Sequence, residues 1–177
     1  YQPFTIRLDD EAVTARVNSG LFKSDAADKV DATSAPATVS FEWQDAEGVR
    51  VTKRFTFQPD GYVIAVDIAV QQDGAALSPT VQWGPGLGDD IALAEAGSFL
   101  APSYSTPAQA LVHRDGSVTR LTAAGVEEGA FLFAGIDDHY FTALALNDPA
   151  QPVPMRFEHT PFVVPSKGEG LPPGRYA

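Results

Sequence analysis

The sequence contains no cysteine among its 177 residues, which excludes disulfide bridges, Cys-bound zinc sites and thiol chemistry. Basic residues are scarce: 12 Lys and Arg stand against 23 Asp and Glu, for a formal net charge of −11. Binding to nucleic acid or to an anionic lipid surface needs a clustered basic face, so this charge argues against both partners. No uninterrupted apolar run approaches the roughly 18 to 20 residues that cross a bilayer.

Motifs that carry enzymatic chemistry are also missing. The sequence has no Gly-x-Ser-x-Gly elbow, no His-Glu-x-x-His pattern and no Cys-His arrangement. The glycine-rich stretch Gly84–Gly88 lacks the lysine of a phosphate-binding loop and is followed by Asp89 and Asp90, which would repel a phosphate. We interpret that stretch as a structural turn and predict no cofactor.

Three groups of titratable residues offer only weak candidate sites. Asp137-Asp138-His139 is the densest cluster, but it lies between two expected strands, where it is typical of a solvated turn. His113 and His159 show no ligand spacing to it, so no metal site is predicted. The adjacent acids Glu127 and Glu128 would face opposite sides of a strand, which makes them a poor acid and base pair. We therefore predict no catalytic residue.

What the sequence does contain is period-two alternation of apolar and polar residues, interrupted by 15 Gly and 14 Pro. Residues 62–70 give the clearest core strand, because their large apolar side chains fall on one face and the smaller or polar ones, Val63, Ala65, Asp67 and Ala69, on the other. The helical signal is weak and is confined to residues 89–96. The polar stretch 22–37 is expected to be a long loop, and Asp45–Gly48 a hairpin turn. Strands are predicted over 4–8, 12–17, 38–44, 49–57, 62–70, 78–83, 109–114, 117–122, 130–136, 139–146 and 153–159.

Ten or so strands exceed a small single sheet, so we expect a mainly antiparallel all-β fold in which two sheets pack face to face as a large β-sandwich. A closed barrel is the alternative. The length of the chain requires no more than one domain, residues 1–177. Both ends break off at expected strands, which predicts a piece of a longer polypeptide.

Two features of this pattern invite functional interpretation. Lys53 falls on the apolar face of strand 49–57, where we expect it to snorkel, to pair with a buried carboxylate or to protect a sheet edge. Residues 96–107 lack clean alternation yet are rich in apolar side chains. They give a candidate partner-binding patch, although packing of the stretch onto its own sandwich is the simpler interpretation. With the preceding turn, the candidate residues are Leu87, Phe99, Leu100 and Tyr104.

Several segments, taken in order, resemble the large periplasmic domain of the YidC membrane protein insertase of Gram-negative bacteria, in the YidC/Oxa1/Alb3 family. The segments are Gln2-Pro3-Phe4, Ser19-Gly20-Leu21, Val51-Thr52-Lys53-Arg54-Phe55-Thr56-Phe57, Gly61-Tyr62-Val63, Trp83-Gly84-Pro85-Gly86-Leu87-Gly88 and Gly135-Ile136-Asp137-Asp138-His139-Tyr140-Phe141-Thr142-Ala143. Their order and spacing across nearly the whole chain carry the resemblance.

The resemblance implies a β-supersandwich of the galactose mutarotase-like kind, on the periplasmic side of the bacterial inner membrane. It implies a non-catalytic accessory role in the insertion, folding and assembly of membrane proteins. The implied partners are Sec translocon auxiliary proteins such as SecF and membrane-protein clients. It also implies membrane attachment through transmembrane segments absent from this chain, and a family domain that extends beyond both of its ends.

The same fold suggests an alternative of a different class, a carbohydrate-binding or aldose-epimerase-like domain. An epimerase of this kind resembles a concave β-surface with a His and a carboxylate as acid and base. The sequence offers no convincing pair of this kind on adjacent strands, and a fold by itself does not transfer activity.

Overall fold

The structure is a computed structural model that describes residues 3–26, 28–83, 109–121, 125–137, 141–150 and 152–159. The chain divides into two compact units, Tyr1–Trp83 and Gly84–Ala177. The assignment of all 177 residues to one domain stays a prediction.

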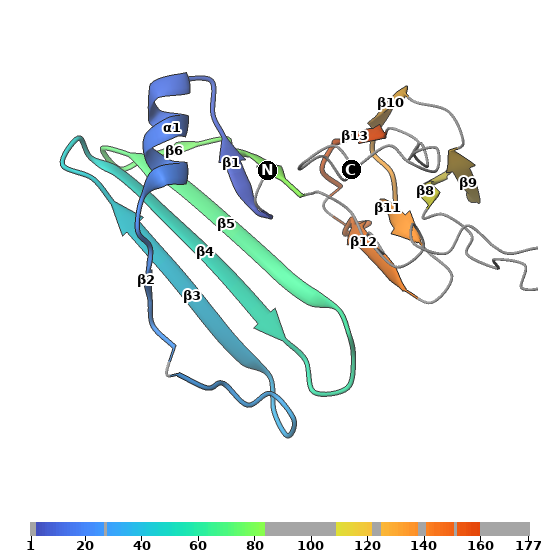
Figure 1. The fold of residues 1–177 in the computed structure, drawn as a ribbon, viewed down its shortest axis with the longest axis horizontal. Helices are drawn as coiled ribbons and strands as arrows, with labels where there is room; N and C mark the ends of the chain where they lie inside the picture. Colours follow the sequence, from blue (N-terminus) through green and yellow to red (C-terminus); the bar gives the residue numbers. More distant parts are fainter. Residues whose placement is uncertain are drawn as a thin grey trace, which may run out of the picture. The chain divides into compact units, whose positions relative to one another are not determined.

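The first unit is built on a five-stranded antiparallel sheet with the strand order β2-β3-β4-β5-β6 (Figure 1). A separate two-stranded sheet pairs β1 with β7, and one helix, α1, lies between β1 and β2 in the chain. The elements are β1 (Thr5–Arg7), α1 (Glu11–Ser19), β2 (Lys23–Ser24), β3 (Ala37–Gln44), β4 (Val49–Phe57), β5 (Ile64–Gln72), β6 (Ala75–Leu77) and β7 (Thr80–Gln82).

The β3–β4 hairpin forms where the alternation predicts it, with Gln44 opposite Arg50 next to the turn. Asp45 closes the turn, because its carboxylate accepts hydrogen bonds from the backbone N–H groups of Glu47 (3.0 Å) and Val49 (2.8 Å). Gly48 has a φ of 82°, a left-handed conformation that favours glycine. Burial raises the pKa of Asp45, but these backbone hydrogen bonds and the Arg16 guanidinium outweigh it and hold that pKa below its usual range.

Residues 12–17 were predicted as a strand, and this prediction is wrong: they lie in α1. Asp10 caps the helix, since its carboxylate accepts from Ala12 N (2.8 Å) and Val13 N (3.0 Å). Val13 and Val17 are four residues apart, so they share one face of a helix as well as one face of a strand. The structure buries both and leaves Ala15 between them exposed, as helical geometry requires.

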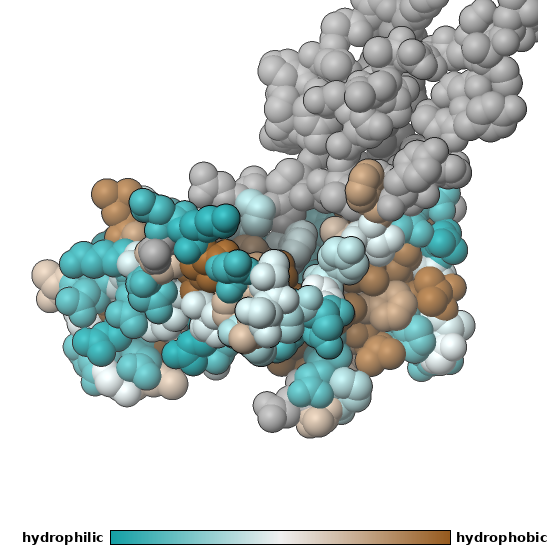
Figure 2. Space-filling model, turned by 90° about the horizontal axis from the view of Figure 1, so that it is seen from below, coloured by the Kyte–Doolittle hydropathy of each residue, from teal (hydrophilic) through white to brown (hydrophobic). Residues whose placement is uncertain are grey.

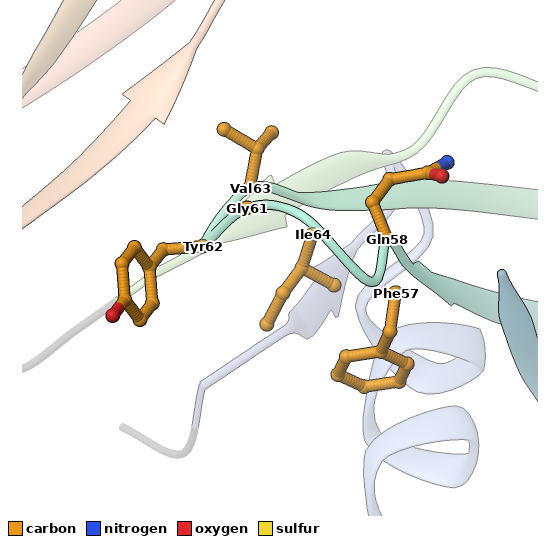
Figure 3. A pocket seen from close by; sticks show the side chains of 6 residues that line it. All are labelled: Phe57, Gln58, Gly61, Tyr62, Val63 and Ile64. Atoms are coloured by element: carbon orange, nitrogen blue, oxygen red, sulfur yellow. The ribbon is translucent and has the colours of Figure 1, made fainter. Parts of the chain in front are cut away.

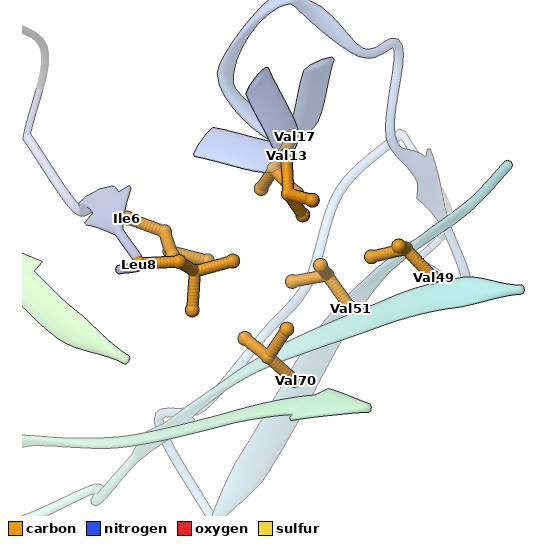
Figure 4. Close-up of a cluster of buried hydrophobic side chains, with 7 residues drawn as sticks. All are labelled: Ile6, Leu8, Val13, Val17, Val49, Val51 and Val70. Carbon is orange, nitrogen blue, oxygen red and sulfur yellow. The ribbon is translucent and has the colours of Figure 1, made fainter. Parts of the chain in front are cut away.

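The core of the first unit lies between α1, β1 and one end of the five-stranded sheet. Figure 4 shows the side chains from the helix and the sheet pointing toward one another. Phe22, Trp43, Ile68 and Leu77 pack around this cluster. Its buried members are Ile6, Leu8, Val13, Val17, Val49, Val51 and Val70.

Strand 62–70 forms as β5, shifted by two residues, but its prediction as the clearest core strand is only partly right. Of its apolar face, only Val70 is buried. Ile64 and Val66 remain 46% and 40% exposed, because α1 and β1 cover the opposite end of the sheet. The central strands are longer than the elements that cover them in the described part of the first unit.

The second unit contains a four-stranded antiparallel sheet of order β12-β11-β8-β9 and a two-stranded sheet that pairs β10 with β13. Met155 and Phe157 of β13 pack against a small core of Val112, Phe131 and Ala134. The strands are β8 (Gln109–Arg114), β9 (Ser117–Leu121), β10 (Gly125–Gly129), β11 (Phe133–Asp137), β12 (Thr142–Leu146) and β13 (Met155–His159).

One buried amide holds three separate segments of the second unit together. Asn147 is 8% exposed, and its Nδ2 donates to the carbonyls of Phe131 (3.0 Å) and Val153 (2.8 Å). Its Oδ1 accepts from Val153 N at 2.9 Å, and its own N–H donates to Leu132 O at 2.8 Å. The side chain therefore fixes the chain before β11 to the chain before β13.

The predicted fold class is confirmed. Every pairing of described strands is antiparallel, α1 is the one helix in the described ranges, and none of the described sheets closes into a barrel. This secondary-structure content is consistent with an all-β sandwich. Three short or polar strands, β2, β6 and β10, were not predicted, and β2 interrupts the expected loop over residues 22–37.

Candidate functional site

The predicted partner-binding patch lies outside the described residues. This holds for Leu87, Phe99, Leu100 and Tyr104, and also for the turn that follows Trp83. The expected helical turns over residues 89–96 lie outside them as well. Trp83 itself is described, and its ring meets the ring of Phe4 edge-on at a centroid distance of 5.1 Å.

Of the Asp137-Asp138-His139 cluster, the structure describes only Asp137, the last residue of β11. Its carboxylate forms an ion pair with Arg120 of β9 at 2.8 Å. His113 lies on β8 with its ring against Phe133, at a centroid distance of 5.1 Å. Within the described ranges no three His, Cys, Asp or Glu side chains gather as metal ligands.

The adjacent acids Glu127 and Glu128 lie on β10 and pair with different arginines, as expected for neighbours on a strand. Glu127 contacts Arg114 at 2.6 Å, and Glu128 contacts Arg156 at 2.7 Å. Their carboxylates are thus engaged in separate ion pairs, which suits a structural role: Glu127 joins β10 to β8, and Glu128 joins β10 to β13.

Lys53 lies on the apolar face of β4, as its position in the alternation predicts. Its Nζ donates to the carbonyl of Phe4 at 2.9 Å and lies 4.7 Å from the ring centroid of Phe22. Burial lowers the pKa of Lys53. Because β4 runs between β3 and β5, protection of a sheet edge is the wrong interpretation. No described carboxylate lies within ion-pair distance of Lys53, so its polar contact is a backbone carbonyl.

The structure brings together an exposed apolar surface that the sequence did not single out. Phe57 and Ile64 are paired across the β4–β5 hairpin, and Figure 3 shows their side chains on the same side of it, with Val63 on the other side. With Tyr62, which is fully exposed, they line a shallow hollow of ≈ 200 Å³. Figure 2 shows that apolar side chains also reach the surface elsewhere, as patches among hydrophilic ones.

A sequence signal for this surface was present but was assigned to the core. Tyr62, Ile64 and Val66 were placed on one apolar face; the structure keeps Ile64 and Val66 there, whereas Tyr62 lies before the start of β5. The alternation does not show which end of this apolar face is covered by other elements of the fold. We refer to the half-buried side chain of Phe57 and the exposed side chains of Tyr62, Ile64 and Val66 as the hairpin patch.

Comparison with known protein families gives one match, the YidC periplasmic domain, over residues 5–168. This span includes every described helix and strand, from β1 to β13. The chain belongs to the YidC periplasmic domain family. The resemblance noted from the sequence motifs is therefore confirmed.

Membership of the YidC periplasmic domain family places the chain in the periplasm. No curated protein and no solved structure matches the chain significantly. No helix within the described residues is long and apolar enough to cross a membrane. In this YidC periplasmic domain, the hairpin patch is the described feature best suited to contact another molecule, because it combines exposed apolar side chains with a hollow.

Proposed function

We propose that this domain is a non-catalytic accessory part of a YidC insertase in the bacterial inner membrane. It supports the insertion, folding and assembly of membrane proteins through protein contacts. Its partners are Sec translocon auxiliary proteins such as SecF and membrane-protein clients. The observation that carries the proposal is the match to the YidC periplasmic domain over residues 5–168.

The described chemistry supports contact over catalysis. Glu127, Glu128 and Asp137 are each engaged by an arginine, and the ring of His113 packs on an aromatic neighbour. The hairpin patch, by contrast, brings several exposed apolar side chains together. Surfaces of this composition mark sites of protein association.

The proposal is tested in the full parent protein, in cells of a Gram-negative bacterium. One strain produces the intact protein and another produces it without residues 5–168. We expect SecF to co-purify with the intact protein and to be lost with the shortened one, at equal amounts of both in the membrane. Equal recovery of SecF with the two proteins would contradict the proposed partner.

The carbohydrate-binding alternative is addressed by isothermal titration of the full chain with a panel of monosaccharides and disaccharides. No heat of binding is expected. A saturable heat that disappears in a His113→Ala variant would favour the sugar-binding function and count against a domain that binds only proteins.

A further inference from the structure

The outer edge of β5 is open along most of its length. On its inner side β5 pairs with β4 from Ile64 to Gln72, but on its outer side β6 pairs only with Val70, Gln71 and Gln72. Among the described ranges, no strand hydrogen-bonds to the outer side of Ile64–Ala69 (Figure 1). Backbone N–H and C=O groups along such an edge are a template for another strand.

The opposite edge of the same sheet is covered in its middle. There β2 pairs with Phe41 and Glu42 of β3, and Asp25 occupies the next position along that edge. The Asp25 N–H donates to Ser40 O at 3.2 Å, and Ser40 N donates to the Asp25 carboxylate at 2.8 Å. Each edge strand is therefore paired over three residues, and the longest open run lies on β5, from Ile64 to Ala69.

The open edge lacks the devices that usually block strand addition. Its sequence, Ile64-Ala65-Val66-Asp67-Ile68-Ala69, contains no proline and no lysine. Its register with β4 is continuous, so no bulge turns it away. The one charged residue is Asp67, whose side chain is 75% exposed and lies 3.9 Å from Arg54 across the strand pair.

The hairpin patch adjoins this edge on one face of the sheet. Residues on a strand alternate between faces, so Ile64 and Val66 lie on the apolar face while Asp67 lies on the other. A strand added beside β5 would place every second side chain next to the hairpin patch. Its remaining side chains would lie next to Asp67. The edge is thus complementary to a strand in which apolar residues alternate with basic ones.

A second copy of this chain fits the edge poorly. The chain carries a net charge of −11, so two copies repel each other. Self-pairing of a six-residue edge would also bury much less than the roughly 800 Å² per partner of a stable interface. An extended segment with Lys or Arg avoids the repulsion and gains affinity from main-chain hydrogen bonds.

We propose that the outer edge of β5, from Ile64 to Ala69, accepts an extended segment of another polypeptide as an added strand. The segment has apolar residues alternating with Lys or Arg. This inference rests on the proposed function, because it specifies the chemistry of a protein partner.

The test uses the full chain and a synthetic eight-residue peptide of alternating Val and Lys, capped at both ends. Hydrogen–deuterium exchange is measured with and without the peptide. Every second amide of Ile64–Ala69 points away from β4. Exchange at these outward amides is expected to be fast in the free chain and at least about tenfold slower at saturating peptide, since protection follows closure of the edge. A peptide with N-methyl groups on all its amides, which cannot complete the ladder through either edge, should give no protection.

A charge reversal tests the role of Asp67. Asp67→Lys should weaken binding of the Val-Lys peptide about two- to fivefold, as expected for an exposed ion pair, and should strengthen binding of a Val-Glu peptide. The matched control is Asp28→Lys, which changes the net charge equally at an exposed site in another part of the unit. It should leave both affinities nearly unchanged.

Three results would overturn the inference. One is slow exchange, in the free chain, of the amides of Ile64–Ala69 that point away from β4, which would mean that part of the chain itself covers the edge. Another is protection that rises with protein concentration and without peptide, which would indicate a second copy. The third is equal binding of the N-methylated peptide. Each is independent of SecF recovery, so the inference can fail while the proposed function stands.

Discussion

Truncation of Val17 to Ala tests the placement of α1 over the sheet. Val17 is 0% exposed in the core of the first unit. The change removes two methyl groups, worth about 1.6 kcal/mol of lost burial, and leaves a space that adds about 1 kcal/mol. The better helix propensity of Ala offsets about 0.5 kcal/mol. The free energy of unfolding should therefore fall by about 2 kcal/mol.

The matched variant is Ala15→Gln, two residues away on the exposed face of α1. It should change the free energy of unfolding by no more than about 0.5 kcal/mol. Urea unfolding followed by tryptophan fluorescence measures both, because Trp43 packs against this core. On a strand, positions 15 and 17 would face the same side. A loss for Ala15→Gln as large as that for Val17→Ala would thus refute the helix.

Three further outcomes follow from buried or crowded groups. Asn147→Ala should lower the free energy of unfolding by about 2 to 3 kcal/mol, because it leaves buried backbone groups unpaired. Asn147→Asp keeps an acceptor but loses the donor, so it should recover only part of the lost free energy of unfolding in the same urea assay. Gly135→Ala should lower the thermal midpoint of unfolding, since an added Cβ would meet the backbone carbonyl of Ala143. Gly61→Ala should not, because the Cβ added there makes only an ordinary van der Waals contact with Val63 N. Calorimetry measures both, and equal midpoints would contradict this. Burial lowers the pKa of Lys53 below its usual 10.5, so the unfolded chain binds the proton more tightly and stability rises with pH toward that value. Urea titrations from pH 8 to 10.5 should show this rise in the native chain relative to Lys53→Met, and parallel profiles would count against it.

Local features of the sequence were sufficient to predict the central hairpin. The alternation in residues 38–57 and the turn at Asp45–Gly48 both act over a few residues, and the observed β3–β4 register agrees with them. The helix was missed because two valines four residues apart satisfy a period of two as well as a helical period. Asp10, which precedes the segment and caps α1, was the available signal for a helix.

Burial was harder to predict than secondary structure. The sequence places Ile64 and Val70 on the same apolar face, but only Val70 meets α1 and β1 in the structure. Coverage depends on contacts between distant segments, which alternation within one strand does not encode. The same reason explains Lys53: its face was predictable, but its acceptor, the carbonyl of Phe4, is 49 positions away in the chain.

The pairing of β1 with β7 has a consequence for the order of folding. It joins Thr5 to Gln82, at opposite ends of the first unit, whereas β3, β4 and β5 are connected by short turns. Closing a long loop costs more chain entropy than closing a hairpin. The three-stranded meander should therefore form early, with the β1–β7 closure and the docking of α1 following late. Destabilising changes in β1 should then mainly speed unfolding, while those in β4 should slow folding.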